Sequence, residues 1–174
     1  LTDVSPRAIA VGLPGKISYA FDAYTSQLRY VWTGPFLDVK SMWTLRGAGP
    51  VKILGQKCYT APAEFPLRVG DPAATPRVQY LGYDLIQGYP QFRFDVNGVL
   101  VRELINVQEG GGAANKLACH FDLGAVDKDV WFNGGPEATV AGALAPSPEA
   151  KGWWKIPGGS SVRFTVEIPV SLAH

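Results

Sequence analysis

The chain has 174 residues, and its 16 Lys and Arg side chains nearly balance 15 Asp and Glu, so it presents no strong net field to nucleic acid or an anionic membrane surface. A membrane-spanning helix is also not expected, because no apolar run approaches the roughly 20 residues that one needs. Its 20 Gly, 14 Pro, 5 Trp and 7 Tyr favour many short strands joined by turns over long helices. We therefore expect a single domain over residues 1–174. The N-terminus shows no basic-then-apolar leader, so we expect that a signal was removed or that the domain belongs to a longer chain.

The first part of the chain predicts short strands and one glycine-punctuated loop. Strand-like runs occupy residues 8–11, 17–21 and 27–32, and a Thr-Gly-Pro break follows the third run. Residues 36–43 then lead into a loop at 44–50 that mixes polar and aromatic side chains. Further short strands are predicted at 51–54 and 65–69. Pro66 places the second of these at a sheet edge, because proline has no amide to donate to a ladder.

Three consecutive antiparallel strands are predicted at residues 77–86, 91–96 and 99–105. Phe92, Phe94 and Val96 alternate with polar residues, which is the period of two that sends one side chain to a core and the next to water. Asn97 and Gly98 then form a two-residue type I′ turn, because both tolerate the positive φ that this turn requires.

The rest of the chain is rich in loop signals but ends on a clear strand. Residues 117–121 resume strand character after the Gly run at 110–112, and short apolar pieces at 130–132 and 138–140 interrupt a loop-rich stretch. At the C-terminal end, apolar side chains alternate with polar ones at Val162, Phe164, Val166 and Ile168. About ten to twelve strands with short connections predict an all-β fold, an antiparallel two-layer sandwich of the jelly-roll kind, with a closed barrel as the alternative.

The adjacent Trp153 and Trp154 raise a question of burial. In an extended segment, neighbouring side chains point to opposite sides, so one of the two rings points away from the core. That ring is a candidate surface anchor.

The cysteines and histidines give little sign of a metal site. Cys58 and Cys119 fit no metal or redox spacing, and they form either one disulfide or two small buried thiols. The imidazoles are His120 and His174. Cys119 and His120 are adjacent and point to opposite faces of a strand, so we expect a structural His120 and no metal.

A candidate ligand-binding site lies around the loop at residues 34–50. Its acidic, aromatic and cationic side chains are Asp38, Trp43 and Arg46, with Asp22, Tyr30 and Trp32 beside them if the preceding strand ends there. Such a set suits a sugar, because a ring stacks on the C–H faces while charged groups hold the hydroxyls. The alternative is structural: Trp32 and Trp43 pack in the protein, and Asp38 and Arg46 pair to fix the loop.

Several motifs together resemble a known module. They occupy residues 17–23, 28–34, 36–38, 43, 46–47, 52–55, 65–71, 88–90 and 102–105. Over roughly residues 7–106 the chain resembles a β-rich module of large secreted or periplasmic proteins that also carry haem-c and sugar-dehydrogenase-like domains. The resemblance implies an extracytoplasmic accessory domain in an electron-transfer or carbohydrate-processing assembly, and it assigns no catalytic residue. The chain has no Cys-x-x-Cys-His motif, so any haem belongs to a neighbouring domain or partner.

The leading functional prediction is a non-catalytic, secreted or periplasmic module, without a cofactor of its own, that binds carbohydrate or docks to a partner domain. A carbohydrate-active enzyme is one alternative, with Asp22, Asp38 or Glu103 as acid and base, and it would need two of these carboxylates across a cleft. An accessory domain that binds a c-type cytochrome is the other.

Overall fold

The structure is a computed structural model that describes residues 1, 3–40, 51–108, 115–141 and 152–170. One layer of the fold is a six-stranded antiparallel sheet in the order β13-β15-β11-β10-β9-β8. Its strands are β8 (Val78–Ile86), β9 (Tyr89–Val96), β10 (Val99–Gln108), β11 (Asn115–Val126), β13 (Thr139–Ala141) and β15 (Gly159–Val170). The outer strands β8 and β13 each pair with one strand among the described residues, so the sheet is open and the alternative of a closed barrel is wrong.

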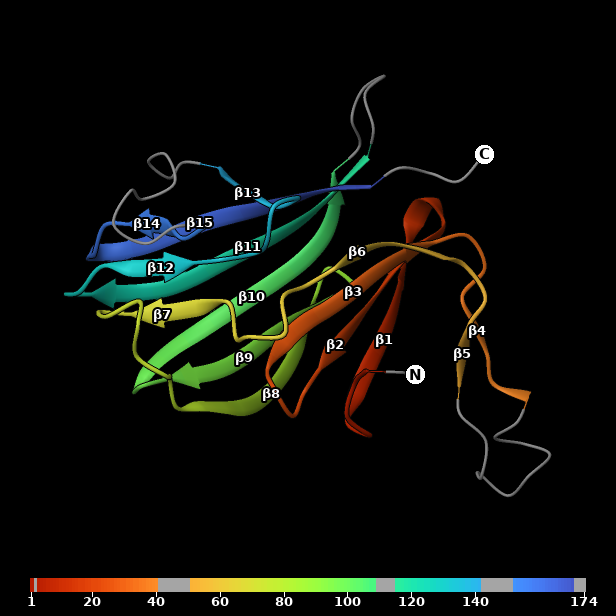
Figure 1. Cartoon of the computed structure of the whole chain (residues 1–174), viewed down its shortest axis with the longest axis horizontal. Helices are drawn as coiled ribbons and strands as arrows, with labels where there is room; N and C mark the ends of the chain where they lie inside the picture. Colours follow the sequence, from red (N-terminus) through yellow and green to blue (C-terminus); the bar gives the residue numbers. More distant parts are fainter. Residues whose placement is uncertain (2, 41–50, 109–114, 142–151, 171–174) are drawn as a thin grey trace.

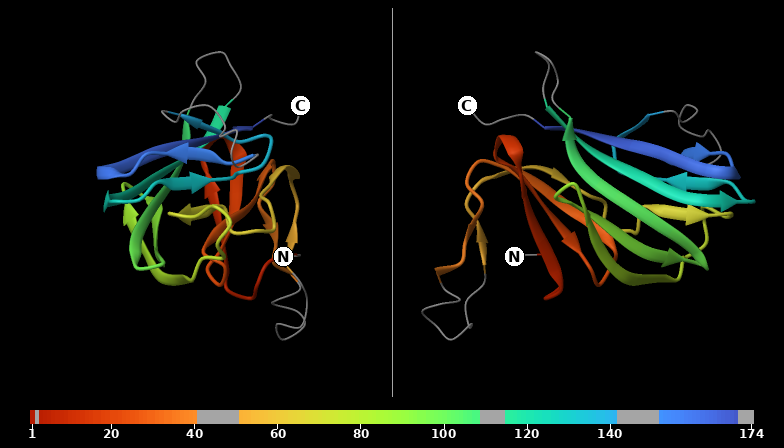
Figure 2. Two further views of the ribbon diagram at one scale, coloured as in Figure 1. Left: turned by 60° about the vertical axis from the view of Figure 1, so that its left-hand side comes forward. Right: turned by 180° about the vertical axis from the view of Figure 1, so that it is seen from behind.

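The second layer consists of two smaller sheets that lie end to end over the first (Figures 1 and 2). The four-stranded sheet contains β1 (Ala8–Leu13), β2 (Ile17–Asp22), β3 (Gln27–Thr33) and β6 (Gln56–Thr60). The three-stranded sheet contains β7 (Leu67–Val69), β12 (Val130–Phe132) and β14 (Trp154–Ile156). Between them runs a seam that the connection from β6 to β7 crosses. The predicted two-layer antiparallel sandwich is therefore confirmed.

The predicted meander of β8, β9 and β10 is present. Asn97 and Gly98 have φ values of 53° and 89°, as a type I′ turn requires. The turn before β9 uses the same geometry at Gln87 and Gly88, with φ values of 51° and 86°. These tight turns fix the register, so that Phe92, Phe94 and Val96 all face the core.

A single hydrophobic core fills the space between the layers. Both layers contribute, with Tyr19, Phe21 and Tyr59 on one side and Phe92, Phe94, Ile105 and Leu117 on the other. Phe21 lies parallel to Phe92 with the ring centroids 3.7 Å apart, which joins β2 to β9. The four predicted inward residues of β15 are all buried as well: Val162, Phe164, Val166 and Ile168.

A second, smaller core covers the outer face of the four-stranded sheet. Tyr30 and Trp32 of β3 are its buried rings, and Leu37 and Ile53 pack on them. These two residues come from a short antiparallel pair, β4 (Leu37–Asp38) and β5 (Lys52–Ile53), which projects from the sandwich in Figure 1. The sheet is thus covered on both faces where β3 runs.

Three details differ from the expectations or extend them. The connection expected between residues 54 and 65 contains the strand β6, and the strand β14 at 154–156 was not expected. The apolar pieces near 130 and 138 are the short strands β12 and β13. Pro66 directly precedes β7, which is an edge strand as predicted. None of the described helical residues forms a segment long and apolar enough to cross a membrane.

Candidate functional site

The predicted ligand loop is only partly placed. Trp43 and Arg46 lie outside the described residues, so the structure does not test whether they form a site. Asp38 is half-buried in β4, and its carboxylate accepts a hydrogen bond from the Lys40 amide at 2.9 Å. This hydrogen bond fixes the backbone just after β4. That Asp38 binds a ligand stays a prediction.

Trp32 supports another aromatic side chain. Its ring is fully buried, and its indole N–H donates to the Phe36 carbonyl at 3.1 Å. The rings of Trp32 and Phe36 are stacked with centroids 5.8 Å apart and planes 18° from parallel. Phe36 is 43% exposed, so it presents the aromatic surface here while Trp32 holds it in position.

Phe36 borders a cleft that sequence reasoning did not identify. The cleft has a volume of about 540 Å³ and lies between the turn that joins β1 to β2 and the turn that follows β3. Lys16, Ser18, Thr33 and Phe36 are among its lining residues. The turn between β1 and β2 is a short 3-10 turn, η1 (Pro14–Lys16), in which Lys16 has a φ of 57°. The only sequence signal was an aromatic residue directly after a Gly-Pro break.

Glu103 is a buried carboxyl within the main hydrophobic core. It lies on the inward face of β10 between Phe92 of β9 and Phe121 of β11, and it is 3% exposed. Burial raises the pKa of its carboxyl to about 8, although a hydrogen bond with Cys119 acts in the opposite direction. Glu103 is therefore neutral at neutral pH. The sequence did carry the signal, since Glu103 shares the period-two face of Val101 and Ile105.

Cys119 and two tyrosines surround this carboxyl. The Cys119 thiol is free and buried, and its pKa is raised well above the usual range by burial and by Glu103. Tyr19 and Tyr59 also have raised pKa values, caused first by burial and then by the nearby ionisable groups. Cys58 is the second free thiol, half-buried on β6, and it donates to the Val31 carbonyl at 3.6 Å. The two cysteines are thus unlinked.

The acidic residues considered for catalysis occupy different places. The Asp22 carboxylate accepts hydrogen bonds from the Ser5 amide at 2.7 Å and the Tyr24 amide at 2.9 Å. Burial alone would raise the pKa of Asp22, but these hydrogen bonds outweigh it and lower the pKa. Asp22 thus caps a turn, Glu103 lies between the sheets and Asp38 lies in the projecting β4–β5 pair. The interior pocket that Glu103 lines contains neither of the other two.

His120 is structural, as predicted. Its two ring nitrogens lie 3.0 Å from the Thr165 hydroxyl and 3.2 Å from the Asn106 side-chain oxygen. Burial lowers the pKa of His120, which keeps the ring neutral. Within the part of the chain that the structure describes, no three metal-ligating side chains gather.

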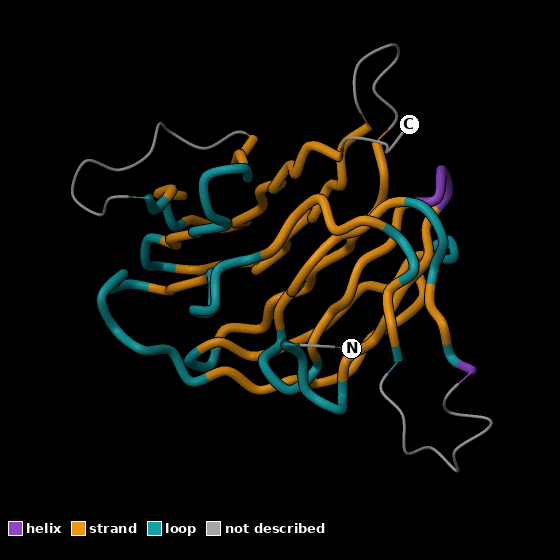
Figure 3. The backbone as a smooth tube through the Cα atoms, turned by 45° about the vertical axis from the view of Figure 1, so that its right-hand side comes forward, coloured by secondary structure: helices purple, strands orange, loops and turns teal. Residues whose placement is uncertain are grey.

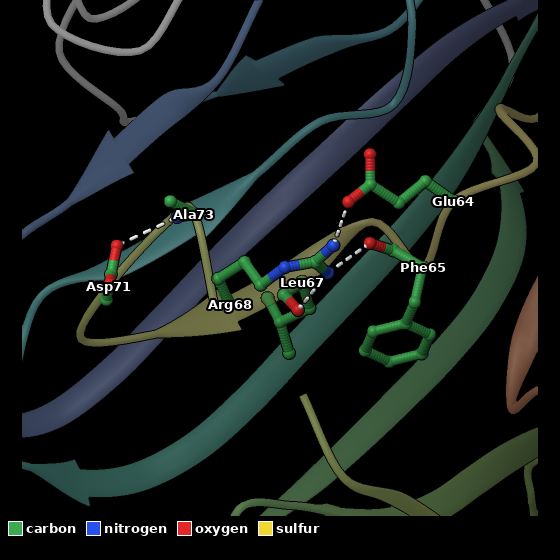
Figure 4. A network of polar contacts seen from close by, with 6 residues as sticks. All are labelled: Glu64, Phe65, Leu67, Arg68, Asp71 and Ala73. Carbon is green, nitrogen blue, oxygen red and sulfur yellow. Dashed lines mark hydrogen bonds and ion pairs between the residues drawn. The ribbon is translucent and has the colours of Figure 1, made fainter. Parts of the chain in front are cut away.

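Arg68 organises the outer face of the three-stranded sheet (Figure 4). It is 3% exposed, and its guanidinium donates to the carbonyls of Phe65 and Leu67 and pairs with Glu64. The central carbon of the guanidinium, Cζ, also lies 5.0 Å from the centre of the Trp153 ring. Trp154 packs against the main core instead, so the two neighbouring tryptophans do face different surroundings.

The free edge of the six-stranded sheet carries exposed apolar side chains. Four of the nine large hydrophobic residues that are exposed among the described residues lie on β8: Leu81, Tyr83, Leu85 and Ile86. Tyr83 and Leu85 face the layer interface, opposite Phe92 and Pro90 in the β9 register. They are nevertheless 48% and 65% exposed, which shows that the sandwich is open at this edge.

The sequence and the structure were compared with known proteins. No protein family, no curated protein and no solved structure was found to match the chain.

Proposed function

We propose that the chain is a non-catalytic β-sandwich module that docks to a partner through the open edge at β8. The observation that carries this proposal is the concentration of exposed apolar side chains on that strand. Tyr83 and Leu85 lie together on one face of the strand, and neighbouring exposed apolar side chains mark interaction sites more often than scattered single residues do. A long edge strand also presents backbone amides and carbonyls that another strand can pair with.

The partner that fits is an extended apolar segment of another domain or protein. The bulge between Tyr80 and Gly82 interrupts the first half of β8, whereas Tyr83 to Ile86 keep a regular register with β9. Asp84, the acidic residue of this half, is already paired with Arg93 at 3.0 Å. The half of β8 from Tyr83 to Ile86 therefore offers no unpaired carboxylate, and an apolar strand that pairs with it gains both ladder hydrogen bonds and side-chain burial.

The extracytoplasmic setting rests on the resemblance of residues 7–106 to modules of secreted and periplasmic proteins. In such a protein, the natural partner is a neighbouring haem-c or sugar-dehydrogenase-like domain. The proposal needs no cofactor in this chain, and it gives the β8 edge a role that a monomeric enzyme would not require.

The test uses Leu85→Lys, which places a charge on the regular half of β8 at a side chain that is 65% exposed and not part of the core. Peptides selected for binding from a displayed library are titrated against the wild type, this variant and Leu54→Lys, whose parent residue is comparably exposed away from β8. We expect Leu85→Lys to weaken binding at least tenfold and Leu54→Lys to leave it unchanged. Amide chemical shifts should move at residues 83–86 on binding. Selected peptides that bind both variants equally would refute docking at β8.

A second candidate function is carbohydrate binding at the cleft beside Phe36. The observation that favours it is an exposed aromatic ring, fixed from behind by Trp32, next to Lys16. Rings held in this way stack on sugars with little loss of entropy. A glycan array screens the wild type, and any hit is titrated against Phe36→Ala and against Val39→Ala as the exposed control. We expect Phe36→Ala to cost about 2 kcal/mol of binding free energy, as at other hot spots. The absence of a glycan hit, or equal affinities of the two variants, would remove this candidate.

A further inference from the structure

The main core contains a small pocket beneath the seam of the second layer. Its walls are largely apolar, with the rings of Phe65, Phe94, Phe121 and Phe132 among them. The pocket has room of about 30 Å³ for the centres of water molecules. A single buried water needs roughly 10–15 Å³, so this space is large enough for at least one.

Polar atoms without partners are gathered around this pocket. Ser26 and Gln27 both line it, and the Ser26 hydroxyl oxygen and the Gln27 side-chain oxygen are buried and have no hydrogen-bond partner among the described residues. Ser26 and Gln27 are 1% and 3% exposed, so bulk water does not reach their side chains. The Tyr19 hydroxyl, close to Glu103, is unpartnered in the same way.

Glu103 adds a carboxyl that has unused hydrogen-bonding capacity. It also lines the pocket, and Cys119 is the partner that its carboxyl has there. A neutral carboxyl group has one O–H donor and several acceptor positions, so a single thiol does not satisfy it. An occupant of the pocket must therefore offer both a donor and an acceptor, must be neutral and must be very small.

We propose that this pocket is an internal water-binding site, in which at least one ordered water bridges the Glu103 carboxyl to the Gln27 and Ser26 oxygens. Water meets each requirement, since it donates twice and accepts twice within the available volume. Buried polar groups in native proteins are nearly always paired, and an internal water is the usual partner when no side chain reaches them. The site is separate from the β8 edge, so it stands or falls independently of the docking proposal.

The first test is direct observation of the water in the wild-type protein. A crystal structure at high resolution should show density of water size within hydrogen-bonding distance of Glu103 and Gln27. In solution, water-to-protein nuclear Overhauser effects at the methyl groups of Val166 and Ile168, which line the same pocket, should report a long-lived water. An empty pocket, or density for a larger molecule, would overturn the proposal.

The second test distinguishes a wet pocket from a dry one with xenon, which enters apolar cavities. We expect no xenon in the wild-type pocket, because the bound water occupies it. Glu103→Gln keeps a donor and an acceptor and should keep the water, whereas Gln27→Met removes the acceptor and should weaken or abolish the water signal. Xenon binding to the wild type would show a dry cavity and refute the proposal even if the variants do not fold.

Discussion

At the scale of single residues, the protein is distinguished by one carboxyl group in its core. Glu103 takes a position in β10 that would otherwise hold an apolar residue, between two phenylalanines of the flanking strands. Transferring an ionised carboxylate to such a place is so unfavourable that the group stays protonated instead. Its pKa of about 8 is thus a consequence of burial and makes the folding free energy depend on pH.

Glu103→Gln should remove this pH dependence. Because the folded pKa is raised, from 4.5 to about 8, the contribution of Glu103 is fully favourable below pH 4.5 and is lost as pH rises towards 8. At pH 7 the isosteric amide should be more stable than the wild type by up to about 3 kcal/mol, at 1.36 kcal/mol for each pH unit above 4.5. Urea denaturation from pH 4.5 to 9 measures the difference between the two proteins. It should grow from near zero to a plateau above pH 8, and parallel profiles would show that Glu103 ionises freely.

At the scale of elements, tight turns determine how the largest sheet is assembled. Two type I′ turns, at 87–88 and 97–98, hold β9 in register with both of its neighbours. A slip by one residue would turn Phe92 and Phe94 towards water. The turns therefore set which side chains reach the core.

Gly98→Val should destabilise the protein by at least about 1 kcal/mol, because a β-branched residue is strained at the positive φ of this position. Gly159→Val is the matched control. Both glycines have open space where a Cβ would be added, but Gly98 alone of the two has a positive φ, 89°. Thermal and urea denaturation measure the stabilities of both variants. Because neither new side chain meets a neighbouring atom at its Cβ, the difference between them reports backbone strain. Equal stabilities would show that the turn conformation at Gly98 is not required.

At the scale of the whole molecule, the seam in the second layer is the feature that needs explaining. The four-stranded and three-stranded sheets share no strand, and no ladder joins them among the described residues. The Tyr59 hydroxyl at the end of β6 donates to the carbonyl of Gly134, just after β12, at 2.7 Å. This buried hydrogen bond links the two sheets directly. Figure 3 distinguishes the strands of the fold, in orange, from the loops and turns that connect them, in teal.

Tyr59→Phe should therefore loosen both sheets together. The change leaves the buried Gly134 carbonyl without its donor, which costs about 1–3 kcal/mol of unfolding free energy. Hydrogen exchange should accelerate in β6 and in β12, although the substitution lies in only one of them. Tyr24→Phe serves as the control, since Tyr24 is 73% exposed, and it should change stability by less than about 0.5 kcal/mol. Faster exchange in β6 alone would show that Tyr59 does not connect the sheets.

The sequence by itself determined the features that depend on neighbouring residues. The alternation in residues 91–96 and 161–168, and the Asn-Gly pair at 97–98, report local backbone geometry, and the strands and the turn lie where they predict. The all-β class and the two layers follow from the same local patterns. The edge position of the strand that follows Pro66 was also predicted, because a missing amide is a local property.

Only the tertiary structure decided what depends on contacts between distant residues. The polar strand β6 has weak alternation of its own and forms because it pairs with β3, which lies roughly 23 to 30 residues earlier in the chain. From the sequence, Trp32 could either contact a ligand or pack inside the protein. In the structure it is buried in the smaller core, against which Leu37 and Ile53 pack. The alternation with Val101 and Ile105 placed Glu103 on the inward face of its strand, but its neutral state depends on burial between both layers. Tyr83 and Leu85 have an inward register on the edge strand β8 and are nevertheless exposed, which no local pattern encodes.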